Sequence, residues 1–212
     1  MKNIQDINMS AVNFSAVRKN PRGGKFINVL LNNEPIRVQL PPLRAPFGVS
    51  TPDDNVKDYY LSLSMTPDVE QKVSELDDIL VNHVAQNSVE LLGKNVSPEV
   101  IRDLLLNPIA KSSKDPEKSA KYAKTIKMKV STGEGKNIAP FFINRDTQAS
   151  VSDIKPGTTV TTIIEIGQVW FINGKFGASV KLLQGKISPS NTLSDYAFAD
   201  DEEIEIDAPI DD

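Results

Sequence analysis

The chain has 212 residues, of which 39% are hydrophobic and 25% are charged, and its formal net charge at pH 7 is -4. Because it has no cysteine and a single histidine, the composition excludes disulfides, thiol catalysis and zinc sites built from Cys and His. No apolar run approaches the roughly 20 residues that a membrane span needs, so we expect a globular protein without a membrane partner. The stretch "MKNIQDINMSAV" has no continuous apolar segment, which predicts an intracellular protein without a signal peptide.

The first third of the chain is predicted to form strands. Short apolar runs between residues 11 and 40 are separated by the turn signals "KNPRGG" and "NNEP", which indicates two or three antiparallel strands. Four prolines interrupt residues 40–54 and favour an ordered loop or edge there. In "DYYLSLSM", Leu61 and Leu63 alternate with Tyr60, Ser62 and Ser64, which predicts a strand with two chemically different faces.

A helical insertion is predicted at about residues 66–110. Thr66 as N-cap and Pro67 at the first helical position begin a helix whose apolar stripe runs from Val69 to Leu91 and ends near Gly93. The lone histidine, His83, lies within this helix, where we expect a surface or boundary residue rather than a catalytic one. "SPEVIRDLLLNPIA" predicts a second helix that ends at Asn107.

Strands are predicted again after a basic linker at residues 111–124. "TIKMKV" alternates Ile126 and Met128 with Lys127 and Lys129. A long β-branched strand, an Asn-Gly hairpin turn at 173–174 and a return strand follow. The predicted fold class is therefore mainly β with a helical insertion, an OB-fold-like five-stranded Greek-key barrel over residues 1–193.

The candidate catalytic motifs in the sequence lack residues that their chemistry requires. "STGEGKN" lacks the first glycine and the hydroxyl of a P-loop. The acidic pairs Asp53-Asp54 and Asp77-Asp78 have no local partner that would tune one carboxylate against another, so we expect them on a loop and a helix surface. The sequence thus predicts no catalytic residue, no metal site and no cofactor.

Charge divides the chain into two unequal parts. From Ser194 onward there are nine acidic residues and no Lys or Arg, which leaves 24 basic and 19 acidic residues in positions 1–193. We expect residues 194–212 to be a disordered acidic tail, which could serve solubility, compete for a basic surface or recruit a partner. The predicted partner-binding residues are Asp200, Asp201, Glu202, Glu203, Ile204, Glu205, Ile206, Asp207, Ile210, Asp211 and Asp212.

Cationic side chains alternate with aromatic ones on the predicted strands and turns. This combination suits single-stranded nucleic acid, since a cationic groove follows the phosphates and exposed rings stack on bases. Lysines on an outer strand face are often only solvated, and the neighbours Trp170 and Phe171 must point to opposite faces. The candidate DNA-binding residues are Lys19, Arg22, Lys25, Arg37, Arg44, Tyr60, Lys121, Tyr122, Lys124, Lys127, Lys129, Trp170, Phe171, Lys175, Phe176 and Lys181.

The order of these parts resembles the single-stranded DNA-binding proteins of T7-like phages and their relatives in large eukaryotic DNA viruses. The resemblance is carried by "LRAPFGVS" followed by "YYLSLSM", by "KYAKTIKMKV", by "DIKPGTTV" leading into "VWFINGKFGASVKLLQGKI", and by the acidic tail. The details look more like the eukaryotic-virus branch. The phage tails finish on an aromatic residue whereas this chain finishes "PIDD", so tail-mediated dimerisation does not carry over.

The resemblance implies an OB-fold protein that coats single-stranded DNA in viral replication, recombination or repair, in the host cytoplasm or nucleus. It also implies a tail that contacts replication proteins such as a polymerase, helicase or primase, and a possible homo-oligomer. Lys127, Lys129, Trp170, Lys175 and Phe176 are the DNA contacts that carry over. A non-enzymatic viral structural or assembly module, whose tail masks a protein-binding surface, stays open as the alternative.

Overall fold

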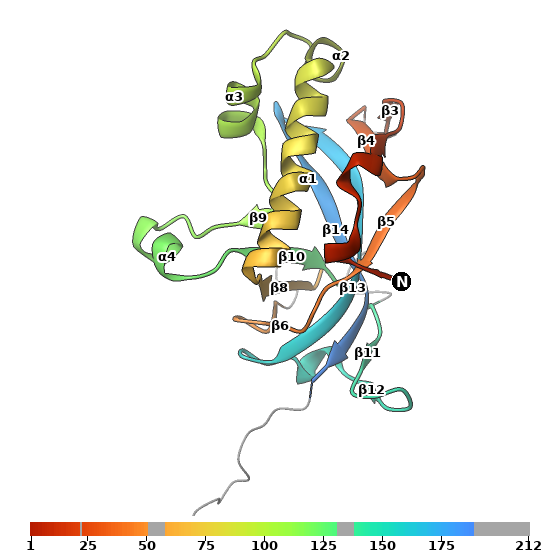
Figure 1. Cartoon of the computed structure of the whole chain (residues 1–212), viewed down its shortest axis with the longest axis vertical. Coiled ribbons are helices and arrows are strands. Elements are labelled where there is room, and N and C mark those ends of the chain that lie inside the picture. The colour runs from red at the N-terminus through yellow and green to blue at the C-terminus, as the bar shows by residue number, and fades with distance from the viewer. Residues whose placement is uncertain (22, 51–57, 131–137, 189–212) are drawn as a thin grey trace, which may run out of the picture.

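A computed structural model describes residues 1–21, 23–50, 58–130 and 138–188 of the chain (Figure 1). Over these residues the protein is mainly β, with one mixed sheet and few helices. The strands are β1 (Lys2–Asn3), β2 (Val12–Phe14), β3 (Arg18–Lys19), β4 (Lys25–Leu31), β5 (Glu34–Gln39), β6 (Leu43–Arg44), β7 (Val49–Ser50), β8 (Tyr60–Ser64), β9 (Ala110–Lys111), β10 (Thr125–Lys129), β11 (Phe141–Phe142), β12 (Gln148–Ala149), β13 (Thr159–Ile172) and β14 (Lys175–Ile187). The α-helices are α1 (Pro67–Gln86), α2 (Ser88–Leu92), α3 (Pro98–Val100) and α4 (Pro116–Lys121), and short helical turns are η1 (Ile4–Asp6), η2 (Met9–Ala11), η3 (Ile101–Leu105) and η4 (Val151–Asp153).

The long hairpin of β13 and β14 is the spine of the sheet. One edge of β13 pairs in turn with β6, β5 and β4. The other edge of β14 pairs with β10, which in turn pairs with β8. Since β6 also packs against β8, the two ends of the sheet approach each other. This arrangement is consistent with an OB-like fold.

The predicted antiparallel strands are present, but the sheet as a whole is mixed. β1 pairs with β5, and β14 pairs with β10 and β11, all in parallel. The apolar alternation that predicted the strands depends only on which face is buried, so it carries no information on strand direction. The parallel pairs join strands that are far apart in the sequence.

The predicted long helix is confirmed, with a break at Asn87 between α1 and α2. The buried stripe of α1 packs into the core, and Gly93 ends α2 with a left-handed backbone at φ 79°. The half-buried His83 ring stacks on Phe14 of β2 with their centroids 3.8 Å apart. His83 is thus a boundary residue that ties the helix to the N-terminal strands, as the sequence indicated.

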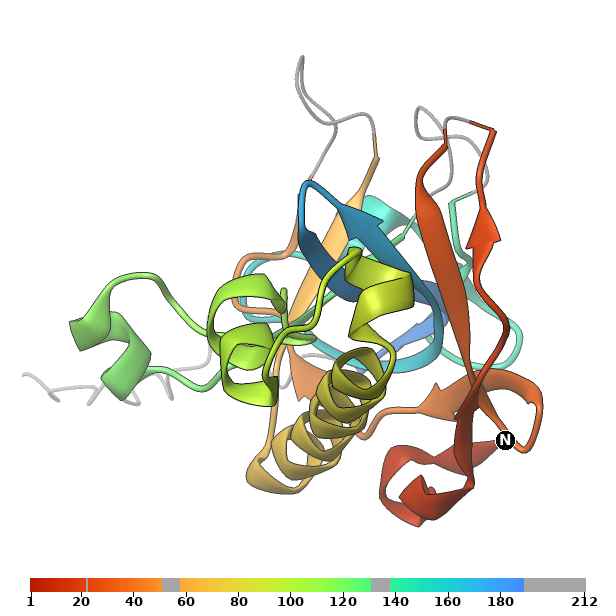
Figure 2. The ribbon, with the colours of Figure 1, turned by 90° about the horizontal axis from the view of Figure 1, so that it is seen from above.

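The second predicted helix is also present, as α3 continued by the π-helical turn η3. The basic linker, in contrast, contains a helix that the sequence did not predict. The side chain of Asp115 caps α4 by accepting hydrogen bonds from the backbone N–H groups of Glu117 and Lys118. Figures 1 and 2 both show α4 standing away from the strands, while α1 lies along them.

None of the described helices is long and apolar enough to cross a membrane. The predicted acidic tail, its eleven candidate partner-binding residues and Arg22 lie outside the described residues.

Candidate nucleic-acid interface

Register between β8 and β10 puts the predicted lysines and a tyrosine on one face. In this antiparallel pair Tyr60 lies opposite Lys129, and Ser62 lies opposite Lys127. The alternate residues of both strands, among them Leu61 and Met128, are fully buried. Burial of the apolar residues therefore fixes Tyr60, Lys127 and Lys129 on the outer face.

Both lysines of β10 have fixed neighbours. Lys127 Nζ lies 4.4 Å from the centroid of the Tyr60 ring, which is cation–π geometry. Lys129 Nζ lies 2.6 Å from Asp58 Oδ2. The cationic groups are held close to an accessible aromatic ring before any ligand is present.

Trp170 adds a second ring to this face from β13. It lies opposite Gly177 of β14. A Cβ at position 177 would lie 3.0 Å from Trp170 Cζ2 and 2.7 Å from the backbone oxygen of Asn107. Only a glycine allows both groups to approach β14 so closely, and Gly177 therefore helps to set where the half-buried indole lies.

A buried carboxylate holds the segment that completes this face. Asp77 of α1 is 5% exposed, and its Oδ1 and Oδ2 accept hydrogen bonds from the backbone N–H of Ile109 at 3.1 and 3.0 Å. Burial raises the pKa of Asp77 to about 6, against the opposing effect of the N–H donors of Ile109 and Ala110. The expectation that Asp77 lies on the helix surface was wrong, whereas Asp78 is exposed and pairs with Arg102 at 2.7 Å.

Lys111 follows directly after this anchored segment. Burial lowers the pKa of the Lys111 ammonium, the charge of Asp77 raises it, and the charge of Lys127 lowers it again. Its Nζ donates a hydrogen bond to the side-chain oxygen of Asn107. Among the charges near Lys111, that of Asp77 has the larger effect, so the buried carboxylate partly offsets the positive charge that Lys111 and Lys127 bring to this face.

These side chains line one open hollow, here called the Trp170 groove. Its lining holds three lysines, two aromatic rings and no carboxylate. The lining residues are Tyr60, Asn107, Pro108, Ile109, Lys111, Lys127, Lys129, Trp170, Ala178, Ser179 and Val180. Such a surface can attract anions along its lysines and stack flat rings on its aromatics.

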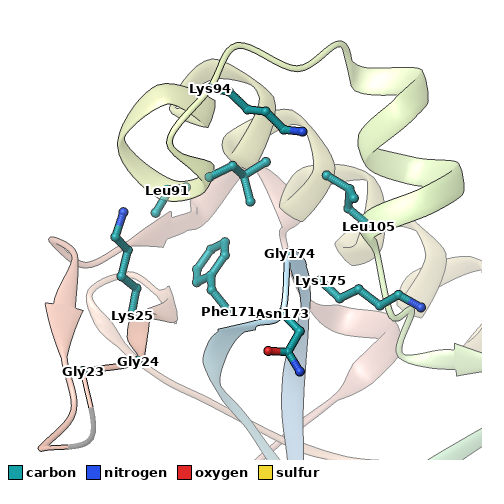
Figure 3. A pocket seen from close by; sticks show the side chains of 11 residues that line it. Gly23, Gly24, Lys25, Leu91, Lys94, Leu105, Phe171, Asn173, Gly174 and Lys175 are labelled. Carbon is teal, nitrogen blue, oxygen red and sulfur yellow. The ribbon is translucent and has the colours of Figure 1, made fainter.

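A second hollow, here called the Phe171 pocket, lies on the other side of the β13–β14 hairpin (Figure 3). Phe171 is half-buried, and Lys25 and Lys175 lie on either side of its ring, with Lys94 above. The lining residues are Gly23, Gly24, Lys25, Leu91, Leu92, Lys94, Leu105, Phe171, Asn173, Gly174 and Lys175. The prediction that Trp170 and Phe171 point to opposite faces is confirmed, since each lines a different hollow.

Other candidate residues do not line either hollow. Arg37 pairs with Glu165 at 2.7 Å, and Lys124 pairs with Glu70 at 2.8 Å. Lys19, Arg44 and Lys181 are exposed. Lys121 and Tyr122 are exposed at the end of α4, with Lys121 Nζ 5.6 Å from the tyrosine ring centroid. Lys181 nevertheless lies opposite Lys129 in the parallel β10–β14 pair, and Lys19 lies opposite Lys25 in the β3–β4 pair, so these two lysines border the Trp170 groove and the Phe171 pocket.

Phe176 does not fit its predicted role. Its side chain is fully buried, and its ring lies against that of Phe171 with centroids 5.8 Å apart. A ring with no exposed surface cannot stack on a base, so Phe176 belongs to the core.

Sequence reasoning missed three members of these sites. Lys111 was counted in the basic linker and Asp77 as a surface acid, while Lys94 was given no role. All three depend on contacts between segments far apart in the chain, so no local pattern could have identified them. Among the described residues there is no cluster of three or more His, Asp or Glu side chains that could hold a metal ion.

A family model matches residues 52–200, which is more than half of the chain. The chain belongs to that family, a family of unknown function (DUF5871). The match spans the helical insertion, the Trp170 groove strands β8, β10, β13 and β14, and part of the predicted tail. No curated protein matches the sequence. Family membership brings no activity with it, and the resemblance to viral DNA-binding proteins stays a prediction.

Solved structures with a similar arrangement of elements include proteins from two bacteriophages. The single-stranded DNA-binding protein from bacteriophage Enc34, in complex with ssDNA, is 15% identical, with 83% of this chain and 96% of that chain covered and a TM-score of 0.46. Gp2.5, a single-stranded DNA-binding protein encoded by bacteriophage T7, is 15% identical, with 84% of this chain and 100% of that chain covered and a TM-score of 0.42.

Proposed function

We propose that this protein is a non-enzymatic, sequence-tolerant single-stranded DNA-binding protein that coats and protects DNA during viral replication, recombination or repair. The convergence of Tyr60, Trp170 and three lysines on the Trp170 groove is the observation that carries the proposal. The fold that would present this groove is a five-stranded OB-type Greek-key barrel, acting in the host cytoplasm or nucleus.

The groove supplies both kinds of interaction that single strands need. Each stacked base contributes roughly 1–3 kcal/mol and every base has a flat face, so stacking tolerates any sequence. The lysines supply the electrostatic part through the phosphates. A double strand would hide its base faces, which favours single strands as the ligand of this groove.

Binding of labelled oligo-dT, followed by fluorescence anisotropy at several salt concentrations, tests the proposal. The logarithm of affinity should fall with the logarithm of salt, with a slope of about -0.7 for each phosphate contacted. If oligo-dT shows no salt-sensitive binding even after removal of the chain beyond Leu193, the proposal fails.

The acidic tail belongs to the proposal as a recruiter of replication proteins or a competitor of DNA. The tail has nine carboxylates, whereas positions 1–193 have more basic than acidic residues. These opposite charges support competition between the tail and DNA for one basic surface. Truncation after Leu193 should tighten oligo-dT binding at low salt and matter less at high salt. Unchanged affinity would exclude the competing role and leave recruitment of polymerase, helicase or primase, or a solubilising role, open.

Charge reversal in the groove distinguishes DNA binding from a viral assembly module. A Lys127→Glu/Lys129→Glu variant should lose most of its oligo-dT affinity and still fold, with a lower thermal midpoint because Lys129 pairs with Asp58. The assembly module predicts that both proteins fold and that neither binds oligo-dT.

A further inference from the structure

We propose that the Phe171 pocket is a second nucleotide subsite, in which one base of a bound strand stacks on Phe171 while its phosphates approach Lys25, Lys94 and Lys175. This inference rests on the proposed function, because it adds a second contact for the same DNA strand. It differs in location, since the pocket lies on the opposite face of the β13–β14 hairpin from Trp170.

The volume of the pocket and the Phe171 ring at its base suit the binding of one flat ring. Its volume is about 330 Å³, close to that of the Trp170 groove at about 340 Å³. Leu91 and Leu105 flank the Phe171 ring (Figure 3). The fully buried Phe176 ring stacks against it, with an interplanar angle of 21°. An aromatic ring fixed between aliphatic side chains is a rigid stacking platform that loses little entropy on binding.

The charges around this floor favour an anion. The described lining contains three lysines and no acidic residue. Lys25 Nζ donates a hydrogen bond to the backbone oxygen of Glu90 at 2.5 Å. Over the described part of the chain, Lys94 and Lys175 form no ion pair with a carboxylate. Uncompensated ammonium groups beside an apolar floor match a phosphate next to a base.

The tip of the hairpin gives a strand a short route between the two hollows. Asn173 and Gly174 form a two-residue turn with positive φ angles of 50° and 74°, so the tip is narrow. Lys175 lies directly after this turn and lines the pocket, while Trp170 and Phe171 are consecutive on β13. A strand stacked on Trp170 can pass the tip and place a later base on Phe171.

Two variants of the full-length chain test the second subsite. Phe171→Leu keeps the apolar packing and removes the stacking face, and Lys94→Glu/Lys175→Glu reverses two exposed charges. With oligo-dT of about 16 nucleotides we expect each variant to bind about tenfold more weakly than the wild type, whereas with about 4 nucleotides, which fill the Trp170 groove alone, affinity should be unchanged. The lysine variant should also lower the salt slope by about 1.4, since two phosphate contacts are lost.

The controls separate this inference from the proposed function. Lys2→Glu/Lys155→Glu changes charge equally at two exposed positions that line neither hollow, and thermal midpoints report folding. If wild-type binding is salt-sensitive but both pocket variants bind the longer oligonucleotide like the wild type, the second subsite is overturned and the Trp170 groove stands. Equal loss for short and long oligonucleotides would overturn it too, because the pocket would then not be a separate subsite.

Discussion

Both sides of the β13–β14 hairpin present lysines beside aromatic rings. The two sides differ in how far those lysines are held in place before a ligand binds. In the Trp170 groove, Lys127 lies over Tyr60, Lys129 pairs with Asp58 and Lys111 bonds to Asn107. In the Phe171 pocket, Lys94 and Lys175 have no such partner among the described residues. Ordering a free lysine costs up to about 1.5–2 kcal/mol, so the groove should dominate affinity and the pocket should adapt to the strand.

The largest expected effect concerns the two phenylalanines that contact each other. Phe176→Ala should lower the free energy of unfolding by about 3–5 kcal/mol, because it empties a fully buried ring site. Phe171→Leu should cost less than about 1.5 kcal/mol, because its site is half-buried and stays apolar. Urea unfolding measures both, and equal losses would show that Phe171 is a core residue rather than a platform.

Charge reversal compares the two hollows directly. Lys127→Glu/Lys129→Glu should weaken oligo-dT binding about 100-fold, or about 2.7 kcal/mol, against about tenfold for Lys94→Glu/Lys175→Glu. Lys127→Gln/Lys129→Gln should fall between the wild type and the charge-reversed groove, since it removes attraction without adding repulsion. A larger loss from the pocket lysines would reverse the order of the two sites.

The pH dependence of stability tests the buried anchor of the groove. Burial raises the pKa of Asp77 to about 6 from the 3.8 of an unperturbed aspartate, so the folded protein binds this proton more tightly than the unfolded chain does. The stability it contributes is fully present below pH 3.8 and is lost as the pH rises through 6. Asp77→Asn cannot ionise, and the difference in unfolding free energy between wild type and variant should shift by about 2–3 kcal/mol from pH 4 to pH 7. Parallel stability curves would mean that Asp77 is not buried as described.

The smallest expected effect tests how tightly Trp170 is packed. Gly177→Ala forces apart groups that lie within 3.0 Å of the new Cβ, and should cost about 1–3 kcal/mol of unfolding free energy. It should also shift the Trp170 emission, because the indole or Asn107 must move. Gly167→Ala is the matched control for chain entropy, since Gly167 is also a strand glycine without a positive φ and the nearest atom to its Cβ, Glu165 Oε1, lies at 3.9 Å.

The sequence predicted four of the five lysines and aromatic residues of the Trp170 groove, and strand alternation placed three of them. In β8 and β10 the buried and exposed residues alternate without interruption, so the pattern fixed Tyr60, Lys127 and Lys129 on one face. In β14 the pattern is broken, because Phe176 and Gly177 are both buried at adjacent positions. The alternation in β14 therefore did not predict that the Phe176 side chain packs into the core.

Lys111, the groove lysine that the sequence did not predict, and the anchor Asp77 depend on contacts that leave no local pattern. Asp77 and Ile109 are 32 residues apart, and only the packing of α1 against the segment before β9 brings them together. Lys111 enters the groove through that contact. Likewise, Lys94 meets Lys25 and Phe171 only because the end of α2 lies beside the hairpin tip. The periodicity of a sequence shows which face of one element is buried and carries no information on contacts between elements.

Trp170 is the only tryptophan in the chain, so its fluorescence reports on the groove alone. The most direct test is titration of the full-length protein with oligo-dT at two salt concentrations, following Trp170 emission and anisotropy of the labelled DNA together. The account predicts saturable quenching of Trp170, with the same midpoint as the anisotropy change and a shift to weaker binding at the higher salt. Salt-sensitive binding without any change in Trp170 emission would contradict the assignment of this groove as the DNA interface.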